Sequence, residues 1–440
     1  MNRVSAKSPI MNAMLFAGVL SAMMCCFGIS SAFARATVFP TGTTIFNPEK
    51  AQDDVYILAV HPDHVAVMDR NGHEYNSWPV QKNNANLRAR LMKNGNLLLA
   101  SSYIDMSAKA ALTESHPTTI REFAWDGKVV WEYTVPEGLD WHNEVIKLKN
   151  GNIMFPAYTT LPKEALAKIK DVDIPWWGAL KRSQTNMRGD VVMEVNPKTG
   201  KTVSEWKTWE HLDVNMFSPM CPINDWTHMN SIQELPENKW YDSGDKRFTP
   251  GNLLLNPRNL DEFYIIDRKS GEVVWSGGHG YKTGLQHCHE PNMVEKGLPG
   301  EGNILIFDNG LFPKTRDRVG QSAVVELNPV SGEIEWMYET KGYSNMHFFS
   351  KTMGSESRLP NGNTFISEDN AGRLFEVTHD PKNPEGGEIV WEYVMPSFSQ
   401  RSRIYAADYC PQMKAIKRVS KPYAVVPPSN TDFHVPGSVK

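Results

Sequence analysis

The chain has 440 residues, of which 46 are Lys or Arg and 50 are Asp or Glu, for a formal net charge of −4 at pH 7. No basic stripe or acidic tail is present, which argues against nucleic acid or an anionic membrane surface as a partner. We therefore expect a small-molecule ligand.

The first 34 residues have the layout of a secretory signal. Arg3 and Lys7 precede an apolar run from Met11 to Ile29, and small residues end at Ala34 in an A-x-A pattern. We expect residues 1–34 to be cleaved as a signal peptide and the mature chain to be periplasmic. A single membrane anchor is the alternative.

A repeated unit organises the rest of the chain. In six places a tight turn leads into a strand that ends in tryptophan, at Trp78, Trp131, Trp206, Trp275, Trp336 and Trp391. Between about 50 and 75 residues separate successive copies, enough for one four-stranded sheet and its loops. Before five of these turns a Gly-Asn pair opens an apolar strand, and both residue types tolerate the positive φ of a hairpin turn. These pairs begin at Gly95, Gly151, Gly251, Gly302 and Gly362.

This pattern predicts an all-β fold, a six-bladed β-propeller over residues 35–420 with a few short helical insertions. The first copy lacks its Gly-Asn half, and the segment Arg403–Tyr409 follows the last tryptophan with strand-like residues. We expect these two pieces to complete one blade and close the ring. Residues 163–170 favour a short helix in an insertion, and residues 421–440 an extended tail.

Three histidines hold equivalent positions in successive repeats. His142, His228 and His289 each come just before the first strand of a blade, and in a propeller that strand lines the central channel. The three side chains should therefore meet near the axis. Such a cluster indicates proton and group transfer or metal binding.

A cationic loop follows the strand of the His289 repeat. After Phe307-Asp308-Asn309-Gly310 come Lys314, Arg316 and Arg318. Guanidinium groups pair well with tetrahedral oxyanions, so this loop suits a sulfate or phosphate ester.

Several of these blocks together resemble the bacterial arylsulfate sulfotransferase family. They are residues 40–48, the Asp225–Ser231 block, the His289 block with its Phe307–Gly310 continuation, and residues 358–377. The resemblance implies a periplasmic six-bladed propeller that moves a sulfuryl group from a small aromatic sulfate donor to a phenolic acceptor. It also implies a transiently sulfurylated histidine, no nucleotide sulfate donor, no cofactor and no metal.

The resemblance assigns roles to individual residues. His228 matches the first active-site histidine of the family and His289 the second, while Arg316 and Arg318 compete for the arginine position. The nucleophilic histidine is expected in the next blade near Thr352, and the nearest candidate there is His347. A loop bulge could bring His347 to the axis, His289 could itself be the nucleophile, or the activity could be lost.

The remaining candidates would bind substrate, through hydrogen bonds or by stacking on the aryl ring. They are His142, Trp226, Asn230, Asn309 and Tyr103. Two other functions stay open: a metal-dependent lyase or hydrolase in which Glu144 or Glu290 joins the three histidines, and a propeller that only binds a ligand. The oligomeric state is also open, with a homodimer as one option. Three cysteines beyond the signal, Cys221, Cys288 and Cys410, allow at most one disulfide, and a buried thiol is expected.

Overall fold

The computed structural model describes residues 41–80, 84–103, 119–174, 178–184, 186–218, 222–278, 286–310, 320–340, 348–379 and 386–419. The chain divides into two units, Met1–Ala36 and Thr37–Lys440, and all described residues lie in the second. The predicted signal peptide, the tail from residue 421, Cys221, Arg316, Arg318 and His347 lie outside the described residues.

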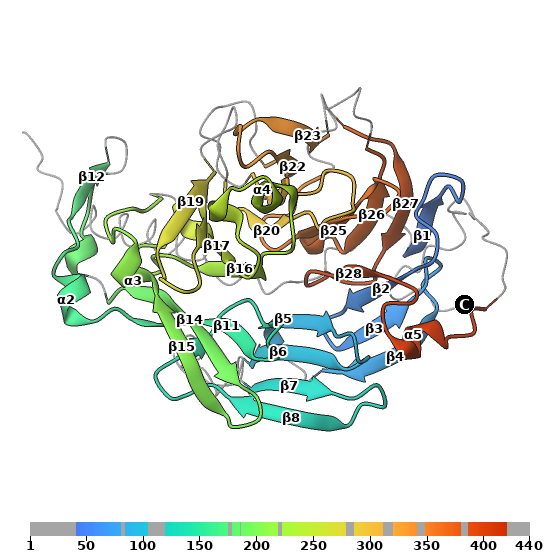
Figure 1. Ribbon diagram of the computed structural model, residues 1–440, viewed down its shortest axis with the longest axis horizontal. Helices are drawn as coiled ribbons and strands as arrows, with labels where there is room; N and C mark the ends of the chain where they lie inside the picture. Colours follow the sequence, from blue (N-terminus) through green and yellow to red (C-terminus); the bar gives the residue numbers. More distant parts are fainter. Residues whose placement is uncertain are drawn as a thin grey trace, which may run out of the picture. The chain divides into compact units, whose positions relative to one another are not determined.

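Six antiparallel sheets of four or five strands form the blades in the described part of this unit, and a seventh, two-stranded sheet lies in an insertion (Figure 1). In order from the inner strand outward, one blade holds β28 (Arg403–Ala406), β2 (Val55–Val60), β3 (His64–Met68) and β4 (Glu74–Pro79). The next holds β5 (Asn84–Leu91), β6 (Leu97–Tyr103), β7 (Thr119–Phe123) and β8 (Val129–Thr134). The third holds β9 (Asp140–Trp141) and β10 (Ile146–Lys147) beside β11 (Ile153–Thr160), then β14 (Arg188–Asn196) and β15 (Lys201–Lys207).

The other three blades repeat this order. The fourth holds β16 (Met229–Glu234), β17 (Leu253–Pro257), β18 (Phe263–Ile266) and β19 (Val273–Gly277). The fifth holds β20 (His289–Met293), β21 (Ile304–Asp308), β22 (Ala323–Leu327) and β23 (Ile334–Tyr338). The last holds β24 (Ser355–Arg358), β25 (Thr364–Glu368), β26 (Arg373–Val377), β27 (Ile389–Val394) and a fifth strand, β1 (Gly42–Phe46). The predicted six-bladed propeller is confirmed.

Helices are short and lie between strands. Four α-helices occur in the described ranges: α2 (Lys163–Leu166), α3 (Thr208–His211), α4 (Lys239–Asp242) and α5 (Pro411–Lys414). The helix predicted over residues 163–170 ends earlier, at Leu166, and the insertion continues into the hairpin of β12 (Val172–Ile174) and β13 (Gly178–Leu180). Among the described residues, no helix has the length and hydropathy needed to cross a membrane.

Burial explains the strand sequences. The middle strands are covered on both faces by neighbouring blades, so β2 and β21 are buried at every position and read as continuous apolar runs. The outermost strand β8 has no fully buried position, and over its second half the exposed Glu132 and Thr134 alternate with the partly buried Trp131 and Tyr133. Continuous and alternating patterns thus mark the inner and outer parts of a blade.

The ends of the chain close the ring. β28 pairs antiparallel with β2, with Arg403 opposite Leu58 and Ala406 opposite Val55, so the last strand of the chain becomes the innermost strand of the first blade (Figure 1). The predicted closure by Arg403–Tyr409 is confirmed. The sequence analysis missed a second clasp, in which β1 adds to the outer edge of β27.

The six tryptophans of the repeat form a ring of inter-blade hydrogen bonds. Five lie in the outermost strand of their blade and Trp391 lies in β27, just inside the added β1. The indole N–H of each donates to a backbone carbonyl of the next blade. The acceptors of Trp78, Trp131, Trp206, Trp275, Trp336 and Trp391 are the carbonyls of Ala124, Pro197, Gly271, Pro329, Gly386 and Arg70, at 2.8–2.9 Å. The last bond returns to the first blade. The tryptophans therefore join neighbouring blades.

The Gly-Asn pairs are turns, but the two residues have different tasks. The glycine takes positive φ in all five pairs, whereas none of the asparagines does. Instead, the asparagine amide donates to a glutamate of the third strand in four blades, as Asn363 does to Glu376 at 2.6 Å. Only the glycine therefore uses the positive φ that both residue types tolerate, and in four of the five pairs the carboxylate holds the asparagine side chain.

Candidate functional site

The three histidines lie at the heads of successive inner strands, as predicted. His142 directly follows β9, His228 directly precedes β16, and His289 begins β20. Of the eight described residues other than glycine with positive φ, six lie at strand heads of this kind: Asn143, His228, His287, Glu290, Met353 and Arg401. Such strained conformations gather where the surrounding structure holds side chains in set directions.

His142 and His228 are in direct contact. Their rings meet edge to face, with centroids 4.4 Å apart. His142 Nδ1 lies 2.6 Å from Asp190 Oδ1, and His228 Nδ1 lies 2.6 Å from Asp225 Oδ2. Each carboxylate accepts the Nδ1–H of its imidazole and leaves Nε2 as the ring atom available for proton or group transfer. The arrangement is two carboxylate-oriented imidazoles side by side.

His228 has the more accessible ring of the two. Its side chain is 23% exposed, against 6% for that of His142, and its Nε2 has no hydrogen-bond partner among the described residues. Burial and the charge of nearby Arg258 lower the pKa of His228 to about 4. At neutral pH its imidazole is therefore neutral and can act as a nucleophile or base.

His289 is held at both ring nitrogens. Its Nδ1 lies 2.6 Å from Asn309 Oδ1, and its Nε2 accepts a hydrogen bond of 3.1 Å from the backbone N–H of Met353. The ring is buried, and burial together with Arg401 and Arg258 holds its pKa well below the ordinary value. His289 is thus a neutral, fully hydrogen-bonded imidazole beside the His142–His228 pair.

Arginines and glutamates fill the channel next to the histidines. Glu144 accepts from Arg88 Nε at 2.8 Å and from Arg90 at 2.7 Å, while Glu290 is paired with Arg88 and Arg403. Burial opposes ionisation of Glu144, but Arg88 and Arg90 hold its pKa below the usual range. Both carboxylates that the metal-dependent alternative would use are therefore committed to arginines.

Arg401 links this cluster to the strand heads. It is buried, its guanidinium donates to the backbone carbonyl of Asn230 at 2.7 Å, and it lies 3.5 Å from Glu290. Burial and the neighbouring charge of Arg88 lower its pKa to about 9, so it stays a cation at neutral pH.

A cavity of about 1390 Å³ opens near the ends of the inner strands. Arg90, Glu290 and Arg403 are among its lining residues, whereas His142, His228 and His289 are not. The arginine–glutamate cluster therefore borders this cavity. The described residues that form the cavity walls include no histidine that could act as a nucleophile or base. We therefore place the candidate chemistry at His142, His228 and His289, outside the cavity lining.

The other predicted binding residues are placed as follows. Asn309 is fully buried, orients His289 and donates to the carbonyls of Ser350 and Met353. Asn230 is buried and accepts from the amide of Asn143 at 3.0 Å, which ties two blades together. Both amides therefore position backbone and side chains around the site.

Aromatic stacking on Trp226 finds no support in the structure. The ring is 2% exposed and lies in a hydrophobic cluster, and its indole N–H donates to Met216 O at 2.7 Å. The side chain of Tyr103, on β6, lies outside the described residues. Thr352 does stand at the head of the next inner strand, directly before Met353, as expected from the repeat.

The sequence analysis missed four groups that shape the site: Asp190, Asp225, Arg258 and Arg401. Asp225 had a signal, since it lies three residues before His228 in a polar block. Arg258 directly follows β17, the second strand of the same blade, and its backbone N–H donates to His228 O at 3.1 Å. Asp190 directly precedes the apolar residues Val191–Met193 of β14 and had no signal apart from its charge.

The buried thiols match expectation. Cys288 and Cys410 are both free and buried. Burial raises the pKa of the Cys288 thiol well above its ordinary value, and the thiol donates to Asn256 Oδ1 at 3.2 Å. Cys288 is therefore an unreactive core residue.

The sequence profile of the family described as arylsulfotransferase (ASST) matches residues 119–395, more than half of the chain. No curated protein matches. Among solved structures, a Bacteroides caccae protein of unknown function is 14% identical over 81% of this chain and 97% of its own, with a TM-score of 0.45. Periplasmic gluconolactonase from Pseudomonas aeruginosa is 10% identical over 80% of this chain and 99% of its own, with a TM-score of 0.44. A catalytically inactive virginiamycin B lyase from Staphylococcus aureus is 14% identical over 72% and 71%, with a TM-score of 0.37.

Proposed function

Because the chain belongs to the arylsulfotransferase family, we propose that it moves a sulfuryl group from an aryl sulfate ester to a phenolic acceptor through a sulfohistidine. The observation that carries the proposal is the His142–His228 pair, in which two carboxylate-oriented imidazoles lie side by side. Transfer through an imidazole nitrogen needs a neutral nucleophile and a second proton-transfer group. The pair supplies both.

We assign the nucleophile to His228. Its Nε2 has no hydrogen-bond partner among the described residues, while Asp225 keeps the proton on Nδ1. The two ring nitrogens of His289 are both engaged, so His289 is assigned a positioning role. His347, which the family resemblance favours, lies outside the described residues and is the competing nucleophile that the experiment below addresses.

The reaction would run in two displacements. In the first step His142 is an imidazolium, with one proton on Nδ1 toward Asp190 and one on Nε2. His228 Nε2 attacks sulfur, an N–S bond forms, and the S–O bond to the aryl group breaks as the phenoxide takes the Nε2 proton of His142. In the second step the acceptor phenol returns a proton to His142, its oxygen attacks sulfur, and the N–S bond breaks. The histidines end as they began, and no metal or nucleotide takes part.

Negative charge on the sulfuryl oxygens needs cations beside His228. Arg258 lies close enough for its charge to lower the pKa of both His228 and His289. Preorganised cations of this kind stabilise a transition state in which charge moves between oxygens. We assign this role to Arg258, with Arg316 and Arg318 of the following blade as further candidates from the sequence.

The cellular setting is proposed from the sequence. An N-terminal pattern of charged, apolar and small residues fits export to the periplasm. A small aromatic sulfate donor and a phenolic acceptor would then be the partners.

The test is transfer of sulfate from 4-nitrophenyl sulfate to phenol by the purified mature chain. We expect acceptor-dependent release of nitrophenol, resistant to chelator, with kcat reduced at least about 10³-fold in His228→Ala. His211→Asn serves as the control, because His211 stacks on Trp206 near the outer strands. It should keep full activity.

Mass spectrometry of the enzyme quenched without acceptor identifies the nucleophile. A sulfuryl adduct on His228 supports the assignment. An adduct on His347 would move the nucleophile there and leave proton transfer to His228. Absence of any transfer with a range of aryl sulfates would contradict the proposed function.

A further inference from the structure

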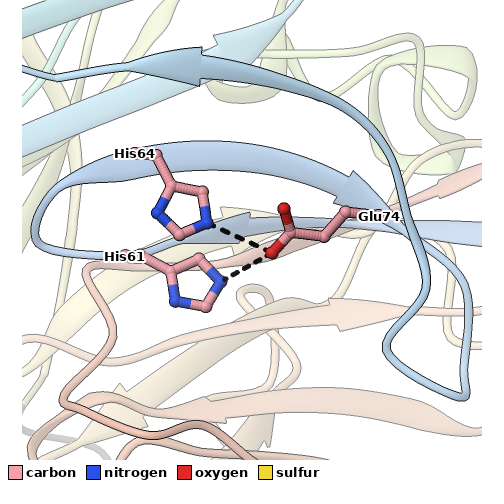
Figure 2. Close-up of side chains that lie close together, drawn as sticks. All are labelled: His61, His64 and Glu74. Carbon is pink, nitrogen blue, oxygen red and sulfur yellow. Dashed lines mark hydrogen bonds and ion pairs between the residues drawn. The ribbon is translucent and has the colours of Figure 1, made fainter.

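A second histidine cluster lies on the first blade, apart from the strand heads. His61 directly follows β2, His64 begins β3, and Glu74 begins β4. One ligand atom of each residue lies within 4.8 Å of those of the other two. In Figure 2 both rings point their Nε2 atoms at the same carboxylate oxygen of Glu74, at 3.1 Å from His64 and 3.9 Å from His61.

His61 brings an unsatisfied nitrogen into this cluster. The residue is 5% exposed, and its Nε2 has no hydrogen-bond partner among the described residues. A buried polar atom without a partner is costly and is rare in proteins. Its ring also stacks on that of His64, with centroids 4.2 Å apart and planes 6° from parallel.

His64 has the partner that a metal-binding histidine usually has. Its Nδ1 lies 2.8 Å from Asp63 Oδ1. Metal-ligating imidazoles almost always donate their second N–H to a carboxylate or carbonyl, which fixes the tautomer and directs the other lone pair at the ion. With its proton on Nδ1, His64 has an Nε2 lone pair on the side where the Nε2 of His61 and a carboxylate oxygen of Glu74 also lie.

We propose that His61, His64 and Glu74 form a binding site for a divalent transition-metal ion such as Zn²⁺, with Asp63 orienting His64. Imidazole and carboxylate are ordinary ligands of such ions. Bonds of about 2.0–2.1 Å in a tetrahedral site put ligand atoms roughly 3.3 Å apart. The observed separations of 3.1 and 3.9 Å lie on either side of this value.

Exposure allows entry of the ion and a water ligand. The Glu74 side chain is 41% exposed and that of His64 29%, while His61 forms the buried wall. Three protein ligands with one solvent-facing side leave a fourth position for water.

The site also lies next to the place where the ring closes, at the pairing of β28 with β2. Val60, the residue before His61, accepts a hydrogen bond from Gln400 N at 3.2 Å and donates one to Ser402 Oγ at 2.9 Å. Arg401, which reaches the central cluster, lies between these two residues. An ion that joins the β2–β3 turn to β4 would therefore stiffen the backbone against which the Arg401 segment packs.

The experiment is a calorimetric titration of Zn²⁺ into the chelator-stripped full chain. We expect one Zn²⁺ per chain, at least tenfold weaker binding in His61→Leu and Glu74→Gln, and about 10- to 100-fold weaker binding in Asp63→Asn. His73→Gln is the matched control in the same blade, since His73 pairs with Asp69 instead. His228→Gln is the control for the central histidines. Both should bind as the wild type does.

Thermal unfolding adds a readout of site occupancy. Zn²⁺ should raise the melting temperature of the wild type and leave that of His61→Leu unchanged, because only an ion bound to the native state stabilises it. If His61→Leu fails to fold, the half-exposed Glu74→Gln carries the test. Absence of binding to the wild type, binding that survives both substitutions, or binding abolished by His228→Gln would each overturn the proposal.

Discussion

At the scale of single residues, two aspartates do different work for two similar histidines. Asp190 is buried, and besides His142 it accepts hydrogen bonds from Thr227 and from the backbone N–H of Met229. Asp225 is partly exposed, and its carboxylate lies 2.6 Å from Nδ1 of His228. One carboxylate is part of the core, whereas the other serves a side chain that reaches solvent.

We expect Asp225→Asn to lower kcat by on the order of 10²–10⁴-fold while the melting temperature stays near that of the wild type. The amide N–H of asparagine can donate to His228 Nδ1, which stabilises the tautomer with its proton on Nε2. In that tautomer Nε2 has no lone pair with which to attack sulfur. Asp190→Asn is the comparison, and it should also lower stability because three hydrogen bonds converge on its carboxylate. Equal thermal stabilities of the two variants would contradict this division.

The pH dependence of transfer follows from the neutral state of His228. Burial and Arg258 lower the pKa of His228 to about 4, so the nucleophile is protonated only below that pH. The acid limb of kcat/KM should therefore lie near pH 4, with activity falling as the pH drops through that value. Arg258→Gln removes a lowering influence, and the acid limb should move to higher pH. A wild-type limb near pH 6.5, the ordinary value for histidine, would show that another group controls the step.

At the scale of elements, the repeat predicted the turns and the strand heads but not the contacts made there. The repeat placed His142, His228 and His289 at equivalent positions, because each lies before the first strand of its blade. Which imidazole nitrogen is free depends on groups from other strands, such as the Met353 N–H on His289. A local pattern contains no information on such partners.

The asparagine of the Gly-Asn turn offers a test at this scale. Asn363 is buried and donates to Glu376 at 2.6 Å and to Lys50 O at 2.8 Å, whereas Asn252 donates only to Arg247 O at 3.4 Å. Hydrogen bonds to charged acceptors are worth more than neutral ones. We expect Asn363→Ala to lower the free energy of unfolding by about 1–3 kcal/mol in urea titrations. Asn252→Ala should cost less, and an equal or larger cost would refute the role given to the carboxylate.

At the scale of the whole molecule, the ring closes through pieces from both ends of the chain. The missing Gly-Asn half of the first repeat predicted that Arg403–Tyr409 supplies a strand, since an unpaired inner edge would be left otherwise. The clasp of β1 on β27 and the arginine–glutamate cluster were not predictable. Arg88, Glu144, Glu290 and Arg403 come from four separate blades, and only the closed ring brings their charges together.

Removal of β28 tests how much its pairing with β2 contributes to closure of the ring. A chain that ends at Ser402 loses the pairing of β28 with β2 and the buried side chains of Cys410 and Met413. The backbone edge of β2 is then free to pair with other chains, as exposed sheet edges do. We expect aggregates in size-exclusion chromatography and loss of the cooperative thermal transition, while a chain that ends at Val419 keeps β28 and α5 and elutes as the full chain does. A well-behaved Ser402 truncation with an unchanged melting temperature would mean that the tryptophan ring and the β1 clasp suffice to hold the blades together.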